Sequence, residues 1–160
     1  MSKSKKDYHR TLPKKRMASG ALILNRSGEI LLLKPSYKPV WEIPGGVVEL
    51  QESPLQACRR EIKEEIGIDI EIGQLLCVDY QSENDQRTEA VNFIFFGGVL
   101  SAEAIEQLQV DQKEILTFAF FTPDKVAEKT AATLGGRIAQ SMEALNLGKT
   151  VYLEDQQLPH

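Results

Sequence analysis

Residues 46–68 of the chain read GVVELQESPLQACRREIKEEIGI. Ser53 is a favourable helix N-cap, Pro54 suits the first helical position, and Gln56 completes a capping box with Ser53. The pattern predicts a helix that begins at Ser53, runs to about Ile66 and stops at Gly67. Its buried stripe is predicted to contain Leu55, Cys58, Ile62 and Ile66.

Three acidic residues of this helix share one side, away from the apolar stripe. Glu61, Glu64 and Glu65 have i, i+3 and i+4 spacing, so their carboxylates repel one another. A bound divalent cation reverses that repulsion because it carries the largest local charge. Oxygen ligands without nearby His or Cys favour Mg²⁺ or Mn²⁺ over Zn²⁺. The alternative is an ordinary solvated helix face, on which Arg60 and Lys63 pair with the acids.

The stretch as a whole fits the pattern G-x5-E-x7-R-E-U-x-E-E-x-G-U, in which U is an aliphatic residue. Its fixed positions are Gly46, Glu52, Arg60, Glu61, Ile62, Glu64, Glu65, Gly67 and Ile68. This pattern resembles the Nudix box, the signature of enzymes that hydrolyse nucleoside diphosphates linked to another group. The resemblance favours the metal interpretation of the acids. It also implies an α/β fold, an α/β/α sandwich with a mixed β-sheet.

The resemblance further implies a set of metal ligands. Glu61, Glu64 and Glu65 are the expected carboxylate ligands, and the carbonyl group of Gly45 is expected to join them. The expected cofactor is Mg²⁺, with Mn²⁺ able to substitute. The glycines before the helix would let the backbone pass close to the metal, although paired glycines also suit any turn.

The catalytic groups are less narrowly defined. Arg60 is expected to fix the rotamers of the metal-binding acids through a carboxylate bond, together with Glu52. The general base in the family is either a box glutamate, here Glu61, or a glutamate from a later loop. Glu114 precedes a predicted strand and resembles the place of that later glutamate, which makes it a candidate base or an extra metal ligand. Both assignments stay open, since an isolated loop acid is often only a solvated charge.

Substrate contacts are expected just before the box. Tyr37, Lys38 and Trp41 lie there, and an aromatic side chain could stack on a nucleobase. The alternative is that Trp41 packs in the core and Tyr37 lies in a surface loop. The patterns typical of hydrolases of ADP-ribose, dinucleoside polyphosphates, coenzyme A and NADH are absent, so the sequence does not select a substrate.

Composition indicates one globular domain: the 160 residues are 42% hydrophobic and 26% charged. We expect a basic flexible arm at 1–16, the Nudix hydrolase domain at 17–147 and a C-terminal tail at 148–160. The arm has seven Lys and Arg residues against Asp7, which permits nucleic-acid binding but is more typical of a solubilising terminus. Cys58 and Cys77 fit reduced structural thiols and a cytoplasmic protein. No apolar run is long enough for a membrane span, and a homodimer is possible.

Outside the box, turn signals and apolar runs predict the remaining elements. A hairpin is expected at 17–24 and 29–34, and a helix at 135–145. Further strands are expected at 75–78, 90–100 and 116–121, with a brief one at 150–153. A short helix or linker is expected at 102–108, and a helical turn at 123–129.

These observations predict a Mg²⁺-dependent enzyme acting on a small nucleotide or nucleotide derivative. The expected reaction cleaves a phosphoanhydride bond in a nucleoside diphosphate linked to another moiety, NDP-X to NMP and P-X, as in nucleotide-pool sanitation or metabolite turnover. One alternative is a module that senses nucleotides without hydrolysing them; the complete acid set argues against it. The other alternative is an RNA-end pyrophosphohydrolase that uses the basic arm.

Overall fold

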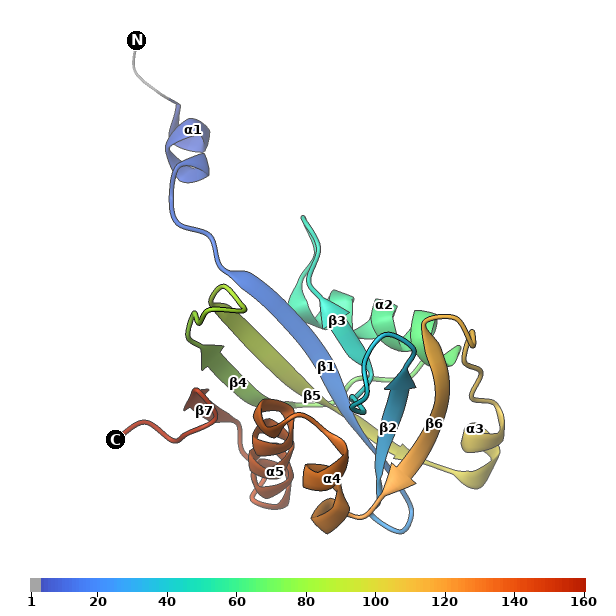
Figure 1. Ribbon diagram of the computed structural model, residues 1–160. Coiled ribbons are helices and arrows are strands. Elements are labelled where there is room, and N and C mark those ends of the chain that lie inside the picture. Colours follow the sequence, from blue (N-terminus) through green and yellow to red (C-terminus); the bar gives the residue numbers. More distant parts are fainter. Residues whose placement is uncertain (1–3) are drawn as a thin grey trace.

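The structure, a computed structural model, describes residues 4–160 (Figure 1). Its helices and strands, in chain order, are α1 (Lys5–Arg10), β1 (Arg16–Asn25), β2 (Ile30–Pro35), β3 (Gly45–Val47), α2 (Pro54–Ile66), β4 (Leu75–Gln81), β5 (Ala90–Leu100), α3 (Ala102–Glu106), β6 (Ile115–Phe121), α4 (Pro123–Lys129), α5 (Ala132–Asn146) and β7 (Val151–Glu154).

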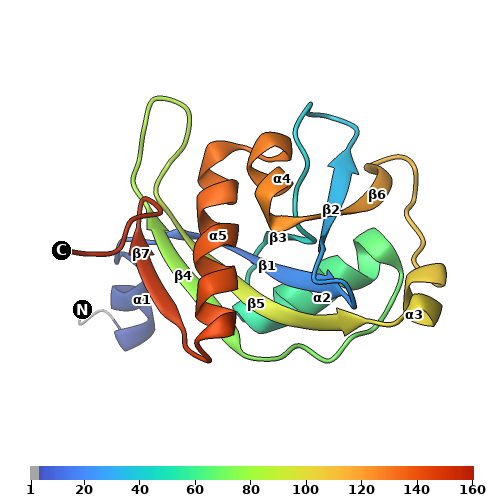
Figure 2. The same ribbon diagram turned by 90° about the horizontal axis from the view of Figure 1, so that it is seen from below.

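The strands form one mixed sheet in the order β6-β2-β1-β5-β4-β7, with β3 paired to β1. The β1–β5 and β4–β7 pairs are parallel, whereas the remaining strand pairs are antiparallel. Helix α2 covers one face of the sheet, and α4 and α5 cover the other (Figures 1 and 2). The predicted α/β/α sandwich with a mixed sheet is therefore confirmed.

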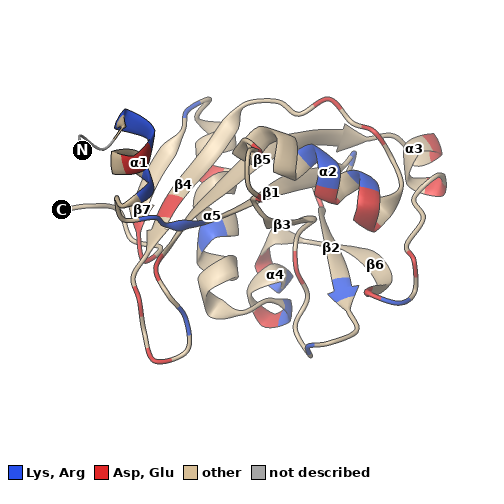
Figure 3. Cartoon of the chain, turned by 90° about the horizontal axis from the view of Figure 1, so that it is seen from above, with Lys and Arg blue, Asp and Glu red and all other residues tan. Residues whose placement is uncertain are grey.

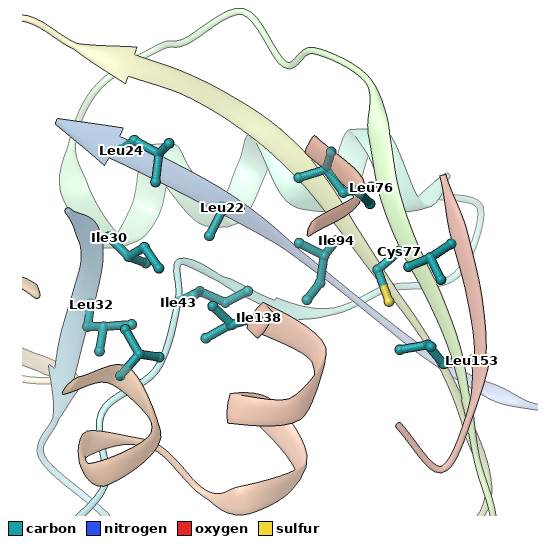
Figure 4. Packing of buried hydrophobic residues seen from close by; sticks show 13 residues of the cluster. Leu22, Leu24, Ile30, Leu32, Ile43, Leu76, Cys77, Ile94, Ile138 and Leu153 are labelled. Carbon is teal, nitrogen blue, oxygen red and sulfur yellow. The ribbon is translucent and has the colours of Figure 1, made fainter. Parts of the chain in front are cut away.

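The central strand β1 contributes to a hydrophobic core on each face of the sheet. Leu22 and Leu24 pack with Ile138 of α5 in one core (Figure 4). Ala21 and Ile23 pack with residues of α2 in the other core. This two-sided burial explains the continuous apolar run of β1, because a strand covered on both faces has no solvent-facing positions.

Helix α2 forms as the sequence predicts. Ser53 Oγ accepts a hydrogen bond from the Gln56 amide at 3.1 Å, and Gln56 Oε1 accepts one from the Ser53 amide at 2.8 Å. Gly67 ends the helix in the left-handed conformation, with φ of 76°. Cys58, Ile62 and Ile66 are buried against the sheet, and this packing turns the acidic side of α2 towards β3.

Several elements differ from the sequence expectation. The glycine pair forms strand β3, for which the sequence predicts no strand, and α5 begins earlier than predicted, at Ala132. The brief strand expected at 150–153, within the predicted C-terminal tail, is present as β7 and pairs with β4. Between residues 4 and 160, no helix is long and apolar enough to cross a membrane.

The predicted basic arm is described from residue 4 onward and contains the short helix α1. Ser4 and Asp7 cap this helix, and none of its residues is buried. The helix extends away from the sheet (Figure 1), and Figure 3 shows basic residues concentrated along it. The division into arm, domain and tail stays a prediction.

Candidate active site

The pairing of β3 with β1 brings two glycines against the acids of α2. Gly45 lies opposite Gly20, and Gly46 lies opposite Ser19. A Cβ atom on Gly45 would lie 2.4 Å from the Ser19 carbonyl oxygen, and Gly45 has a φ of 153°. A Cβ atom on Gly46 would lie 2.4 Å from Glu61 Oε1. Only glycine therefore permits this close approach of β3 to both the strand and the helix.

The glycine pair is also joined to Glu65. The Gly45 amide donates a hydrogen bond to Glu65 Oε2 at 2.8 Å. Burial, together with the negative charges of Glu61, Glu42 and Glu114, raises the pKa of Glu65 to about 8, against the lowering effect of the Gly45 amide. Burial likewise raises the pKa of Glu61, with smaller contributions from Glu64 and Glu114. The site thus crowds carboxylates that water solvates poorly.

Arg60 is the cation that holds this acid cluster together. Its guanidinium makes two bonds to Glu52, Nε to Oε1 at 2.8 Å and Nη2 to Oε2 at 3.1 Å. Its Nη1 donates to Glu61 at 2.7 Å and to Glu64 at 3.1 Å, and Nη2 also reaches the Val47 carbonyl at 3.2 Å. The planar fork of arginine suits such multiple contacts, which a lysine could not make together.

Glu114 lies in a loop that faces the same cluster. Its charge contributes to the raised pKa of Glu61 and of Glu65. The Asp111 carboxylate accepts hydrogen bonds from three consecutive loop amides, at 2.9 to 3.1 Å. The Glu114 carbonyl accepts a bond from the Ser36 amide at 2.9 Å. The loop is therefore fixed beside the acids, with the Glu114 residue itself exposed.

The three residues predicted to contact substrate occupy two different environments. Tyr37 is 64% exposed, and burial and the nearby charges of Glu42 and Glu114 raise its pKa. Lys38 lies 5.1 Å from the Tyr37 ring centroid and forms an ion pair with Glu42. Trp41 instead packs edge-on against Phe121, with ring centroids 5.1 Å apart, beside one core. Their roles in substrate binding stay predictions.

A cavity of about 150 Å³ adjoins the glycine pair. Gly45 and Gly46 border it, so these residues touch both the cavity and the acids of α2. Strands β1 and β5 contribute Gly20, Asn92 and Ile94, and helix α5 contributes Leu134 and Arg137. A ligand seated here would have its end next to the carboxylate cluster.

The NUDIX domain model matches residues 14–141, which is most of the chain. The chain belongs to the Nudix family. A MutT-like protein from Streptomyces ambofaciens is 28% identical over 127 residues, covering 76% of this chain and 73% of that protein. A putative 8-oxo-dGTP diphosphatase from Bacillus subtilis (strain 168) is 36% identical over 84 residues, covering 52% of this chain and 54% of that protein.

A solved structure gives the same result at the level of the fold. The MutT NUDIX hydrolase from Burkholderia pseudomallei has a TM-score of 0.67 and 27% sequence identity, covering 80% of this chain and 98% of that one. The predicted family and enzyme class are confirmed: the chain is a Nudix pyrophosphohydrolase.

Nudix hydrolases generally need a divalent metal ion, and the donor set of this chain fits one. Within residues 4–160, no three His, Cys, Asp or Glu side chains are already gathered into a cation site, and Arg60 lies between Glu61 and Glu64 instead. The available donors are carboxylate oxygens, and that of Glu65 is buried among like charges. Hard divalent cations prefer such ligands and relieve such repulsion.

Sequence reasoning missed a buried polar pair of which one member, Arg137, borders the cavity. Arg137 and Asp79 form a buried ion pair, Nε to Oδ2 at 2.5 Å. The available signal was a charge in each of two otherwise apolar segments, Asp79 within β4 and Arg137 beside Ile138. Because these residues lie far apart in the chain, the pattern alone could not show that they meet.

Proposed function

We propose that this Nudix enzyme hydrolyses a phosphoanhydride bond in a nucleoside diphosphate linked to another moiety, NDP-X to NMP and P-X, with Mg²⁺ as cofactor and Mn²⁺ able to replace it. The observation that supports this most directly is the glycine pair. It borders a cavity on one side and contacts Glu61 and Glu65 on the other. A nucleoside in the cavity would extend its phosphates towards the acids.

Each residue of the cluster has a role in this proposal. Glu61, Glu64, Glu65 and the Gly45 carbonyl would hold the cation, which when bound supplies positive charge against the phosphate oxygens. Arg60 orients Glu61 and Glu64 through its guanidinium. Either Glu61 or Glu114 accepts the proton of the attacking water.

The RNA-end alternative rests on one specific observation, the basic helix α1. This helix carries Lys5, Lys6 and Arg10 and extends from the start of β1 (Figure 1). Deletion of residues 1–15 would lower turnover of triphosphorylated RNA while sparing mononucleotides if the arm binds RNA. Turnover of triphosphorylated RNA that is unchanged by the deletion would contradict this alternative.

The main test is a substrate panel assayed with Mg²⁺ and with Mn²⁺. It comprises nucleoside triphosphates, nucleotide sugars, dinucleotides and capped RNA, with cleavage followed by chromatography of the products. The expected result is metal-dependent release of a nucleoside monophosphate from at least one small nucleotide. The absence of cleavage across the panel, with the protein folded and metal present, would contradict the proposal. Glu71→Gln, an exposed acid outside the cluster, is the matched control for variants of Glu64 and Glu65.

Cellular location and assembly stay predictions. Cys58 and Cys77 are free and buried, which suits the cytoplasmic location that we propose. The proposed partner is a small nucleotide substrate, and a homodimer remains possible. Sedimentation of the purified chain would measure its oligomeric state.

A further inference from the structure

A buried ionic network contains Arg137, which borders the cavity. The Asp79 side chain is fully buried, and that of Arg137 is 9% exposed. Asp79 Oδ2 accepts from Arg137 Nε at 2.5 Å and from Gln156 Nε2 at 3.0 Å, and Oδ1 accepts from the Gln156 amide at 3.0 Å. Gln81 Oε1 accepts from Arg137 Nη2 at 2.8 Å.

This network fixes the Arg137 guanidinium but leaves part of it available. Among residues 4–160, no group accepts a hydrogen bond from Arg137 Nη1, and Arg137 borders the cavity. Gln156, which bonds to Asp79, lies in a turn in which Asp155 and Gln156 both have positive φ, 48° and 64°. A rigid guanidinium with unused donors is thereby presented to whatever occupies the cavity.

Stability alone gives a weak reason for this arrangement. Desolvating two charges often costs as much as their attraction returns, and an apolar pair of similar volume is frequently as stable. In contrast, a buried guanidinium at a cavity wall is well suited to recognise a ligand, because its donors are already oriented.

The other residues of the cavity combine apolar and polar groups. Gly20, Ile94 and Leu134 contribute apolar surface, and Asn92 borders the cavity together with Arg137. The side-chain nitrogen Nδ2 of Asn92 donates to the backbone carbonyl of Asp79 at 3.4 Å, which leaves Oδ1 of Asn92 as an acceptor. At about 150 Å³ the cavity is smaller than the roughly 300–1,000 Å³ typical of sites for whole drug-sized ligands. It suits one ring system, with the remainder of the ligand outside.

We propose that Arg137 determines base specificity by donating from its guanidinium to the acceptor edge of a 6-oxopurine, guanine or hypoxanthine. This inference rests on the proposed nucleotide hydrolase function. Guanine presents two acceptors, O6 and N7, on one edge, whereas adenine presents an amino donor in place of O6. Because arginine has no acceptor atom, it cannot accept a hydrogen bond from the amino group of adenine at that position. Asp79, Gln81 and Gln156 are positioning residues that act through Arg137.

The test measures binding of GMP, IMP and AMP by calorimetry, and kcat/KM for GTP, ITP and ATP. We expect the wild-type protein to prefer the 6-oxopurine nucleotides by about tenfold or more, the range of one good base contact. In Arg137→Met, the ratio of kcat/KM for GTP to that for ATP should fall to about one, with most of the change in KM. Gln156→Ala should reduce it partly, because Arg137 is then less firmly oriented.

Two controls separate specificity from general damage. Arg87→Met removes an exposed arginine outside the cavity and should keep the wild-type preference. Because Arg137→Met leaves Asp79 without its cationic partner, the double variant Asp79→Asn, Arg137→Met is tested beside it, with circular dichroism to establish folding. If Arg137 had only a structural role, its replacement would weaken the binding of all three monophosphates equally and leave the preference for 6-oxopurines unchanged.

Wild-type binding alone can decide the inference, even if every Arg137 variant fails to fold. AMP binding as tight as GMP binding by the wild-type protein would overturn it, as would an unchanged preference in a folded Arg137 variant. The proposed hydrolase function fails separately, because monophosphate binding requires no turnover. A preference for GMP without cleavage of any substrate would support the base contact and contradict only the enzyme reaction.

Discussion

The Gly45 amide donates a hydrogen bond to Glu65 Oε2 at 2.8 Å, and this contact joins strand β3 to helix α2. It spans 20 residues of sequence and fixes a half-buried carboxylate against a backbone that only glycine can supply. The position of the proposed metal-binding acids therefore depends on the backbone path of β3 as much as on the helix that carries them.

Gly45→Ala and Gly46→Ala should have different effects. A Cβ on Gly45 would meet the Ser19 carbonyl oxygen, which cannot move away, whereas one on Gly46 would meet the flexible Glu61 carboxylate. We expect Gly45→Ala to lower the free energy of unfolding by about 1–3 kcal/mol. Gly46→Ala should mainly lower kcat, because Glu61 is displaced. Urea denaturation and steady-state kinetics measure the two effects, and equal destabilisation by both variants would contradict this explanation.

Glu65→Gln should separate activity from stability. The amide keeps an oxygen that can accept from the Gly45 amide, but it removes a carboxyl group whose ionised form is disfavoured near Glu61 and Glu114. We expect kcat to fall by about 10²-fold or more, with a melting temperature equal to or above that of the wild type. Calorimetry and turnover with Mg²⁺ measure these quantities. Nearly full activity in this variant would contradict the proposed role of Glu65 as a metal ligand.

Arg60→Lys should weaken cation binding although it keeps the charge. One ammonium group cannot bond to Glu52, Glu61 and Glu64 in the geometry of the guanidinium fork. We expect the Mg²⁺ concentration for half-maximal activity to rise about 10- to 100-fold, the usual effect of losing support for metal ligands. Arg59→Lys, on the exposed side of the same helix, is the control. An unchanged Mg²⁺ dependence in Arg60→Lys would show that its contacts do not orient the acids.

The elements that the sequence predicts well are those with local signals. Helix α2 has its capping box, its apolar stripe and its terminal glycine within one short stretch, so neither its limits nor its buried face depends on distant contacts. Strand β5 coincides with its predicted range because its apolar and aromatic run is long and bounded by polar residues. The three acids of the cluster, Glu61, Glu64 and Glu65, lie within this same stretch and are found with it.

Features that depend on distant contacts were missed. Strand β3 consists of two glycines and one valine, which have no common tendency to form a strand, and it exists because β1 approaches it closely. The Arg137–Asp79 pair joins residues 58 positions apart. Helix α1 is a different case. Its capping box of Ser4 and Asp7 is a local signal, although a flexible arm is predicted there.

The two cysteines give a prediction about pH. Burial raises the pKa of both Cys58 and Cys77 to about 12, from a usual value of 9.0. Above about pH 9 the unfolded chain therefore loses thiol protons that the folded chain keeps, so stability should fall as pH rises from about 9 towards 12 and be insensitive to these groups below that range. Native protein at pH 8 should resist iodoacetamide, whereas protein in urea should be labelled at both positions. Rapid labelling of the native protein would contradict their burial.

Glu114→Gln decides between the two candidates for the general base. Glu114 lies close enough for its charge to raise the pKa of Glu61 and Glu65, and Asp111 fixes its loop through three backbone amides. If Glu114 takes the proton of water, Glu114→Gln should lower kcat by about 10²- to 10⁴-fold and remove the acidic limb of the pH–rate profile. Asp111→Ala should then lower kcat to a smaller extent, because the glutamate remains but its loop is less firmly held. A mild effect of Glu114→Gln would return the role to Glu61, whose carboxylate is half-buried and bonded to Arg60.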